Sequence, residues 1–339
     1  MLEIKKNISL AQYTTLKIGQ AAEFFSIIKT KEELLEAITW AKNNKKEIFV
    51  LGGGSNILIT SKIKGLVLKN EIKGIDIVRD TKTFSLLSAK SGELWTKYVH
   101  EAAVLNLHGL ENLYLVPGTV GAAPVQNIGA YGVELKDIFY SLLAINLKTG
   151  QEKIFEYDDC QFGYRDSIFK NKLKGRYFIY EVTVKLFKKP NFKLDYGDIR
   201  AKLLDQGIHT PTLMQVVKTI ETIRNSKLPN PVVLANAGSF FKNPEISVTQ
   251  FKKLQKQFPD IKSFSAGNKV KVPAGWLIEQ AGFKGKKFGP VSMYEKQALI
   301  LVNHGGATAK QVLNHVARVQ LAVFKKFAIK IELEVNIIK

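Results

Sequence analysis

Apolar residues recur along this chain either at every second position, as in a strand, or every three to four positions, as in a helix. The places where this spacing changes predict where its elements begin and end. The apolar run over residues 22–29 is typical of a buried strand. Thr30 and Glu33 then form a capping box, which predicts a helix that ends at about Asn43. A second strand, predicted at residues 48–51, follows this helix. The chain therefore begins with a strand, a helix and a strand.

The same patterns predict elements along the rest of the chain. Ser91 is the expected N-cap of a helix that ends near Leu105, and Thr308 and Gln311 form the capping box of a long helix with valines on one stripe. Residues 329–338 alternate strictly between apolar and polar, as a half-buried strand does. Further strands are predicted at 57–59, 65–68, 75–78, 84–89, 138–147 and 177–187, and further helices at 212–226 and 248–257. Strands and helices thus mix in an α+β pattern.

Two segments rich in small residues interrupt this pattern. We call residues 52–56, Gly-Gly-Gly-Ser-Asn, the glycine turn, and residues 117–132 the small-residue ribbon. The ribbon has too much glycine and proline for a helix or a central strand, and its small side chains leave backbone donors uncovered. Such a segment suits a wall against a flat ligand or a diphosphate. An ordinary structural loop is the alternative, and composition alone does not choose between them. The glycine turn leads into an extended run, so the dinucleotide fingerprint that opens a helix is excluded.

The length of the chain predicts two or three domains. The chain has 339 residues, and Lys-Leu-Pro-Asn-Pro at 227–231 ends a helix and marks a domain boundary. We expect domains at residues 1–70, 71–226 and 227–339. No apolar run is long enough to span a bilayer, and the N-terminus lacks the apolar core of a secretory signal. We therefore expect a cytoplasmic protein without membrane insertion.

Charge and composition narrow the classes of function less than the motifs do. The net charge is +20, which nucleic-acid binding, anionic substrates or a lysine-rich surface could each explain. The lysines are spread along the chain, no nucleic-acid-reading motif occurs, and the histidines lack metal-ligand spacing, so we expect neither nucleic acid nor metal. The single cysteine, Cys160, excludes an internal disulfide and reads as a buried small residue.

Three residues stand out as chemical candidates, each with a plain alternative. Arg165 lies in an irregular Tyr-Arg-Asp-Ser segment, where it could bind a carboxylate or pair with Asp166 on the surface. Ser239 follows a glycine and precedes two phenylalanines, in a predicted turn that exposes its hydroxyl. Glu334 lies on the polar side of the last strand. Local sequence alone favours an ordinary structural role for each: a surface ion pair for Arg165, a cap or turn serine for Ser239, and a solvated strand face for Glu334.

Several motifs occur in one order along the chain: GGGSN at 52–56, PGTVGAAPVQNIGAYG at 117–132, YRDS at 164–167, KLPNP at 227–231, GSFFKNP at 238–244, PAGWLIEQAG at 273–282, QALILVN at 297–303 and ELEV at 332–335. A Leu-Asp-Tyr-Gly-Asp loop lies at 194–198. This ordered set resembles the UDP-N-acetylenolpyruvoylglucosamine reductase family, flavoenzymes of bacterial peptidoglycan synthesis. The resemblance extends from Thr15 to Ile338, and the loop at 194–198 is similar to the longer form of the family.

The resemblance implies a fold, two cofactors and a reaction. Two N-terminal α+β subdomains of the vanillyl-alcohol-oxidase type would bind one FAD, and a C-terminal α+β domain would bring the substrate. NADPH would reduce the flavin, which passes hydride to the enolpyruvyl group of UDP-N-acetylglucosamine enolpyruvate and yields UDP-N-acetylmuramate. A monomer is expected. Another flavin oxidoreductase of the same fold would need other residues in place of Arg165, Ser239 and Glu334.

The resemblance also implies roles for individual residues. Arg165 and Glu334 would polarise the substrate carboxylate, and Ser239 would donate the proton to the carbanion. The substrate would be bound by Tyr196, Lys227, Asn243 and Gln297. FAD would be bound by Gly52, Gly53, Gly54, Ser55, Asn56, Pro117, Gly118, Thr119, Gly121, Ala122, Gln126, Asn127, Gly129, Ala130 and Tyr131.

Overall fold

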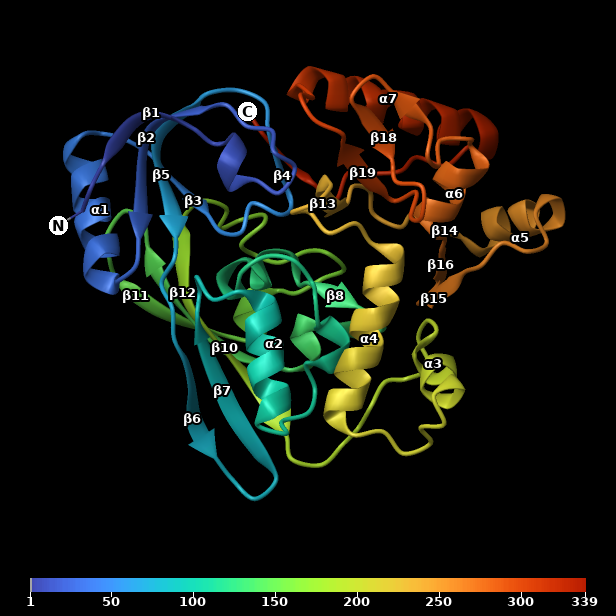
Figure 1. The fold of residues 1–339 in the computed structure, drawn as a ribbon. Helices are drawn as coiled ribbons and strands as arrows, with labels where there is room; N and C mark the ends of the chain where they lie inside the picture. Colours follow the sequence, from blue (N-terminus) through green and yellow to red (C-terminus); the bar gives the residue numbers. More distant parts are fainter. Residues whose placement is uncertain (1) are drawn as a thin grey trace. The chain divides into compact units, whose positions relative to one another are not determined.

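The computed structural model describes residues 2–339, which form two compact units (Figure 1). The first unit contains residues 2–8, 21–53 and 63–226, and the second contains residues 9–20, 54–62 and 227–339. The chain therefore passes between the units several times, and a change of unit falls inside the glycine turn. The three-domain division expected from the sequence stays a prediction.

A four-stranded sheet forms one part of the first unit. Its strand order is β1 (Lys5–Ser9), β2 (Ala21–Ile28), β5 (Ile63–Asn70) and β3 (Ile48–Leu51), with β5 parallel to both β2 and β3. Helix α1 (Lys31–Asn43) buries its apolar stripe in the same core as β2 and β5. Strand β3 therefore ends where the glycine turn begins, beside the end of β5.

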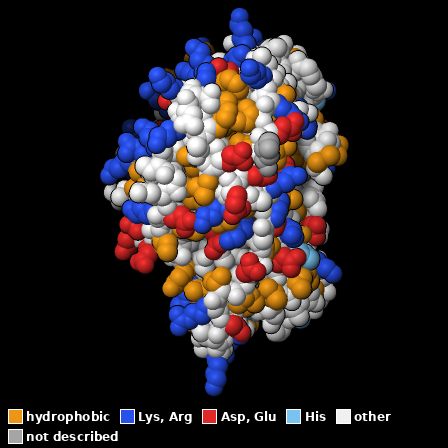
Figure 2. All heavy atoms as spheres, turned by 90° about the vertical axis from the view of Figure 1, so that its left-hand side faces the viewer, with side chains coloured by type: hydrophobic (Ala, Val, Ile, Leu, Met, Phe, Trp, Pro, Cys, Tyr) orange, Lys and Arg blue, Asp and Glu red, His pale blue; other side chains and the backbone are white. Residues whose placement is uncertain are grey.

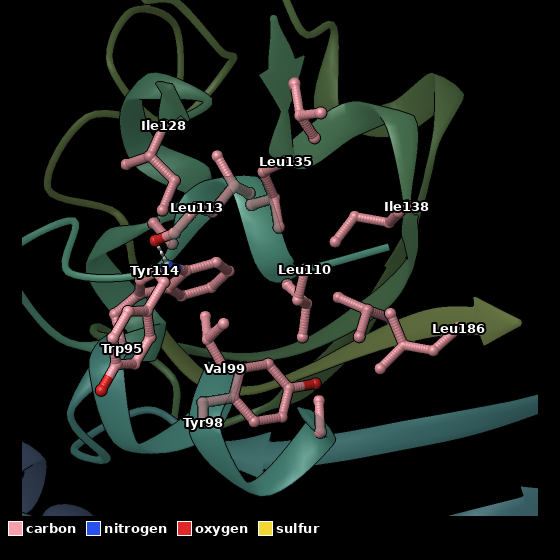
Figure 3. Close-up of a cluster of buried hydrophobic side chains, with 14 of the residues drawn as sticks. Trp95, Tyr98, Val99, Leu110, Leu113, Tyr114, Ile128, Leu135, Ile138 and Leu186 are labelled. Carbon is pink, nitrogen blue, oxygen red and sulfur yellow. Dashed lines mark hydrogen bonds between the residues drawn. The ribbon is translucent and has the colours of Figure 1, made fainter. Parts of the chain in front are cut away.

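An antiparallel five-stranded sheet forms the other part of the first unit. Its order is β11 (Glu152–Glu156), β10 (Phe139–Asn146), β12 (Tyr177–Phe187), β7 (Phe84–Lys90) and β6 (Ile75–Asp80). Helices α2 (Trp95–Val104) and α4 (Leu213–Lys227) share its core (Figure 1). Trp95 and Tyr98 are fully buried there, and the indole of Trp95 donates to the carbonyl of Leu113 at 2.9 Å (Figure 3). This core supports the small-residue ribbon, because Val120, Ala123 and Ile128 belong to it.

The second unit contains two small antiparallel sheets and three helices. One sheet has the order β13 (Ala235–Ser239), β19 (Ile300–Asn303), β18 (Val291–Met293) and β17 (Lys287–Phe288), and the other has β14 (Glu245–Ser247), β16 (Lys269–Lys271) and β15 (Phe264–Ala266). Helices α5 (Val248–Gln257), α6 (Ala274–Gln280) and α7 (Ala309–Phe327) pack in the core of this unit.

Two N-terminal segments complete the second unit. Strand β4 (Ile57–Ile59) pairs in parallel with the last strand, β20 (Asn336–Ile338). Leu16, Ile18 and Leu58 are buried in the core of this unit. The C-terminal region thus depends on residues that lie far from it in the sequence.

Most local signals in the sequence are confirmed. The capping box of Thr30 and Glu33 opens α1, and the capping box of Thr308 and Gln311 opens α7. The valine stripe of α7, at Val312, Val316, Val319 and Val323, is buried. Cys160 is buried, and desolvation raises the pKa of its thiol to about 12.

Some predictions are wrong. Ser91 does not cap a helix, because α2 begins at Trp95 after Leu94, and the hydroxyl of Ser91 instead accepts from Asn70 at 2.8 Å inside the core. The regular C-terminal strand is only β20, since residues 329–335 make isolated backbone contacts. Strand β11 and the short helix α3 (Ile199–Asp205) were not predicted.

Basic side chains are scattered rather than gathered on the face drawn in Figure 2, where acidic and apolar side chains lie among them. No helix among residues 2–339 is both long enough and apolar enough to cross a membrane. Within the same residues, no group of three or more His, Cys, Asp or Glu side chains is arranged to hold a metal ion.

Candidate active site

Gly52 and Gly53, the residues of the glycine turn that belong to the first unit, lie directly on the small-residue ribbon. A Cβ added to Gly52 would stand 2.8 Å from the hydroxyl of Thr119, and one added to Gly53 would stand 3.0 Å from the Cα of Gly118. A Cβ on Gly121 would stand 2.4 Å from the Cβ of Ser91. Side chains at these positions would therefore push the two backbones apart. The glycines let backbone from β3 and backbone from the ribbon meet.

The hydroxyl of Thr119 supports a ligand at this contact. Thr119 is only 4% exposed, and its hydroxyl has no hydrogen-bond partner among the described residues. An unpaired buried hydroxyl costs about 1–3 kcal/mol, so such groups usually have a partner. An unpaired hydroxyl among small residues fits the diphosphate-bearing cofactor that the FAD-binding residues imply.

Arg165 occupies a strained position at the tip of a tight turn. Gly163 and Asp166 exchange two backbone hydrogen bonds, and Arg165 between them has a φ of 55°. Glycine normally takes this position in a turn, because a side chain there strains the backbone. The guanidinium donates to the carbonyl of Gly129 at 2.7 Å. The turn thus holds this cation against the small-residue ribbon.

The buried Asn127 ties the ribbon to the turn of Arg165. Its amide donates to the carbonyl of Gly163 at 2.9 Å and to Glu134 at 3.0 Å, while its oxygen accepts from Lys136 at 3.0 Å. Asn127 itself has a φ of 44°. All three bonds orient backbone and side chains around the ribbon.

Tyr196 packs on the end of the ribbon. Its ring and that of Tyr131 are 6.4 Å apart and perpendicular. The buried amide of Asn112 donates to the carbonyls of Tyr131 and Lys193, each at 2.8 Å, and so joins the ribbon to the loop of Tyr196. Burial raises the pKa of Tyr196, and the charge of Arg165 acts in the opposite direction. Arg165 and Tyr196 therefore share one electrostatic environment.

Ser239 ends strand β13 in the second unit, immediately after a bulge. The register of β13 against β19 shifts between Asn236 and Ser239, and Gly238 has a φ of 68°. A bulge changes the direction of the side chains that follow it, and Gly238 can adopt the positive φ that this bulge requires. The sequence predicted a turn here, so the irregularity was expected but its place in a sheet was not. The hydroxyl of Ser239 makes no hydrogen bond to another described residue.

Glu334 lies next to the backbone of Ser239. Its N–H donates to the carbonyl of Phe240 at 2.9 Å, and its carbonyl accepts from the amide of Asn56 at 3.4 Å. Leu333 pairs with Phe241 in an isolated bridge. The last residue of the glycine turn and two catalytic candidates thus meet within the second unit.

Asn243 and Gln297 flank the N-terminus of α6. The oxygen of Asn243 accepts from the N–H of Ala274 at 2.9 Å, and a Cβ on Gly275 would stand 2.7 Å from the amide oxygen of Gln297. The carbonyl of Leu299, two residues after Gln297, accepts from the N–H of Phe240 at 2.9 Å. These contacts connect both amides to the strand of Ser239.

The predicted site residues form two groups, one in each unit. The first unit holds Arg165, Tyr196, Gly52, Gly53 and the small-residue ribbon, which contains Pro117, Gly118, Thr119, Gly121, Ala122, Gln126, Asn127, Gly129, Ala130 and Tyr131. The second unit holds Gly54, Ser55, Asn56, Lys227, Ser239, Asn243, Gln297 and Glu334. The contacts described above link Arg165, Tyr196 and the ribbon within the first unit, and Asn56, Ser239 and Glu334 within the second.

Two further cations lie beside the ribbon or the glycine turn and were missed from the sequence. Lys69 donates to the carbonyl of Gly52 at 2.7 Å. Arg224 donates to the carbonyl of Leu115 at 3.1 Å and lies 6.0 Å from the ring centre of Tyr131, while its buried Nε has no partner among the described residues. Arg224 does stand one helical turn before the Lys-Leu-Pro-Asn-Pro motif, a signal that could have been used.

Family models match two parts of the chain. Residues 22–156 match an FAD binding domain, and residues 230–338 match the C-terminal domain of UDP-N-acetylenolpyruvoylglucosamine reductase. These ranges contain the small-residue ribbon in the first unit and Ser239 and Glu334 in the second.

Known proteins are similar over the full length. UDP-N-acetylenolpyruvoylglucosamine reductase of Flavobacterium johnsoniae is 47% identical over 99% of this chain and all of that relative, and the enzyme of the same name from Pseudomonas aeruginosa is 43% identical over 99% of both. The crystal structure of the reductase from Thermus caldophilus has a TM-score of 0.68 at 24% identity, with full coverage of both chains. That structural likeness concerns the fold, which is α+β.

Proposed function

The chain belongs to the UDP-N-acetylenolpyruvoylglucosamine reductase family, and from this premise we propose that it reduces UDP-N-acetylglucosamine enolpyruvate to UDP-N-acetylmuramate for peptidoglycan synthesis. It is an oxidoreductase that uses FAD and NADPH. One observation of the structure carries the proposal best. Where Gly52 and Gly53 approach Gly118 and Thr119 closely, the buried hydroxyl of Thr119 has no partner among the described residues.

The first unit's residues would hold the cofactor. The glycine turn and the small-residue ribbon offer backbone N–H groups and the hydroxyl of Thr119 to the diphosphate, and the ribbon offers a flat wall to the ring system. When bound, FAD supplies the hydride relay between NADPH and the enolpyruvyl double bond. Asn127 and Asn112 would keep the ribbon in shape, because the amide of each donates two hydrogen bonds to the ribbon or to its neighbours.

Three side chains would act on the substrate. Negative charge develops on the substrate carboxylate as hydride arrives, so the preorganised guanidinium of Arg165 lowers the barrier, with Glu334 acting on the same carboxylate. The hydroxyl of Ser239 donates a proton to the carbanionic carbon. Tyr196, Lys227, Asn243 and Gln297 bind the sugar nucleotide. The contacts of Arg165 with Gly129 and of Glu334 with Phe240 support this assignment.

The proposed reaction is tested by NADPH oxidation with purified protein. We expect a yellow protein that oxidises NADPH rapidly only when the enolpyruvyl sugar nucleotide is present. Rapid substrate-independent oxidation, or the absence of bound flavin, would count against this function. A monomer in the cytoplasm is the form we propose for it, and light scattering of the purified protein checks the monomer.

The role of Ser239 has a sharper test in the two half-reactions. We expect Ser239→Ala to leave flavin reduction by NADPH unchanged and to slow reoxidation by substrate roughly 10²-fold or more, because only the second step needs the proton. Stopped-flow absorbance follows both steps. Ser292→Ala, which removes another hydroxyl of the same unit, serves as the control. Equal slowing of both half-reactions in Ser239→Ala would remove Ser239 as the acid.

A further inference from the structure

Lys69 lies where strand β5 passes the beginning of the glycine turn. In the parallel pairing of β3 with β5, Lys69 stands opposite Leu51, the last residue of β3. Its ammonium reaches past that strand end and donates to the carbonyl of Gly52 at 2.7 Å. The contact fixes the peptide group from which the glycine turn starts.

Lys69 is a partly buried cation that forms no ion pair within residues 2–339. Its one hydrogen-bond acceptor there is a neutral carbonyl. Burial lowers its pKa, the charge of Glu71 raises it, and the neighbouring Lys73 lowers it. Buried charges are normally paired, because desolvation disfavours them. Glu71 acts on Lys69 without forming an ion pair with it, so an anion bound close to the ammonium would offset its desolvation.

The surroundings of Lys69 indicate where that anion lies. Gly52, which Lys69 contacts, also touches Thr119, whose buried hydroxyl lacks a partner as well. The unpaired hydroxyl of Thr119 and the ammonium of Lys69, which has no ion pair among the described residues, thus both lie beside Gly52. Both would be satisfied by a phosphate group, which accepts several charge-assisted hydrogen bonds.

We propose that Lys69 is a cofactor-positioning residue, which holds the glycine turn through the Gly52 carbonyl and attracts the diphosphate of FAD by its charge. The inference deepens the proposed FAD-dependent function and rests on it. A lysine that only braced the Gly52 carbonyl would matter for stability and would not give FAD binding a dependence on ionic strength. The electrostatic role does, because salt screens the part of the attraction that passes through solvent, although it screens a partly buried charge less than an exposed one.

The test measures FAD binding to the apoprotein by flavin fluorescence at low and at high salt. We expect Lys69→Met to raise the Kd at low salt about 10-fold, which corresponds to about 1.4 kcal/mol, because the variant loses the attraction between the ammonium and the diphosphate. The difference from the wild type should shrink at high salt. Lys69→Arg, which keeps the charge, should recover most of the affinity.

Lys64→Met is the matched control. Lys64 is exposed at the other end of the same strand, and its loss lowers the net charge equally. We expect its Kd and its salt dependence to match the wild type. Weakened binding in Lys69→Met with an unchanged salt dependence, or an unchanged Kd, would overturn the inference. Failure of the wild-type apoprotein to bind FAD would instead overturn the proposed function.

Discussion

His315 is a buried imidazole on α7 with both ring nitrogens unpaired among the described residues. Its residue is 1% exposed, and the rings of Phe283 and Phe288 lie 5.9 Å and 5.1 Å away. Desolvation, helped by the charge of Arg318, lowers its pKa from 6.5 to about 4. The folded protein therefore holds His315 neutral, whereas the unfolded chain protonates it below pH 6.5.

This difference predicts a loss of stability in acid. Below pH 6.5 the unfolded state binds more protons, so the free energy of unfolding falls as the pH drops from 6.5 towards 4. We expect His315→Leu to reduce this fall by on the order of 1 kcal/mol at pH 5. Denaturant unfolding at pH 7 and pH 5 measures the change. His100→Leu replaces an exposed histidine, so its free energy of unfolding should fall between pH 7 and pH 5 as much as that of the wild type. An equal fall in His315→Leu would refute the argument.

Arg165 and Thr119 show what a single residue contributes to the site. Arg165 was recognised from its motif, but its left-handed backbone and its bond to Gly129 follow from the turn at Gly163 and Asp166. Thr119 was one small residue in a ribbon, and the loss of its hydrogen-bond partner is visible only where Gly52 packs on it. A strained residue and an unpaired hydroxyl thus lie where ligand binding is proposed.

At the scale of elements, the N-terminus of α6 sets the position of Gln297. Gly275 lies in the first turn of α6, and a Cβ there would stand 2.7 Å from the Gln297 amide oxygen. A methyl group would displace this flexible side chain rather than the backbone. The glycine therefore makes room for a proposed substrate-binding amide.

A double-mutant cycle tests this relation. We expect Gly275→Ala to raise the KM for the sugar nucleotide several-fold, with FAD content unchanged, because the displaced Gln297 can no longer bind. In a Gln297→Ala background, Gly275→Ala should raise the KM little further, because the side chain that it displaces is already absent. Steady-state kinetics of the two single variants and the double variant measure the coupling. Fully additive effects would show that Gly275 acts independently of Gln297.

Elements with strong local signals were predicted well, and those without them were not. Thr30 with Glu33 and Thr308 with Gln311 satisfy helix N-termini within one turn, so their capping boxes can be read from four residues. Ser91 was predicted to be an N-cap from its residue type alone. The prediction is wrong because its hydroxyl accepts a hydrogen bond from Asn70, twenty-one residues away. Strand β11 is mostly exposed, so its apolar pattern is weak.

At the scale of the whole molecule, each unit is assembled from separate stretches of chain. The second unit needs residues 9–20 and 54–62, since Leu16, Ile18 and Leu58 lie in its core. Backbone bonds from Asn236 to Thr15 and from Thr60 to Ile338 extend this dependence to its sheets. The C-terminal region is therefore not self-sufficient.

We accordingly expect a fragment of residues 227–339 not to fold alone. Removing the two N-terminal segments takes Leu16, Ile18 and Leu58 out of the core and removes the partner of β20, which exposes apolar surface. Circular dichroism of the fragment during heating should show no cooperative transition, whereas the full chain should show one. A cooperative transition in the fragment would contradict this account of the second unit.

The sequence alone determined the helices with caps, the strands with clear alternation, the α+β class and the family, because these depend on neighbouring residues or on ordered motifs. The assigned roles of Arg165, Ser239 and Glu334 came from the same motifs and stay predictions. Only the tertiary structure decided that Lys69 reaches Gly52, that Thr119 is left unpaired and that residues 54–62 join the second unit. Such contacts join distant residues, and their existence depends on how whole elements pack, which no local pattern encodes.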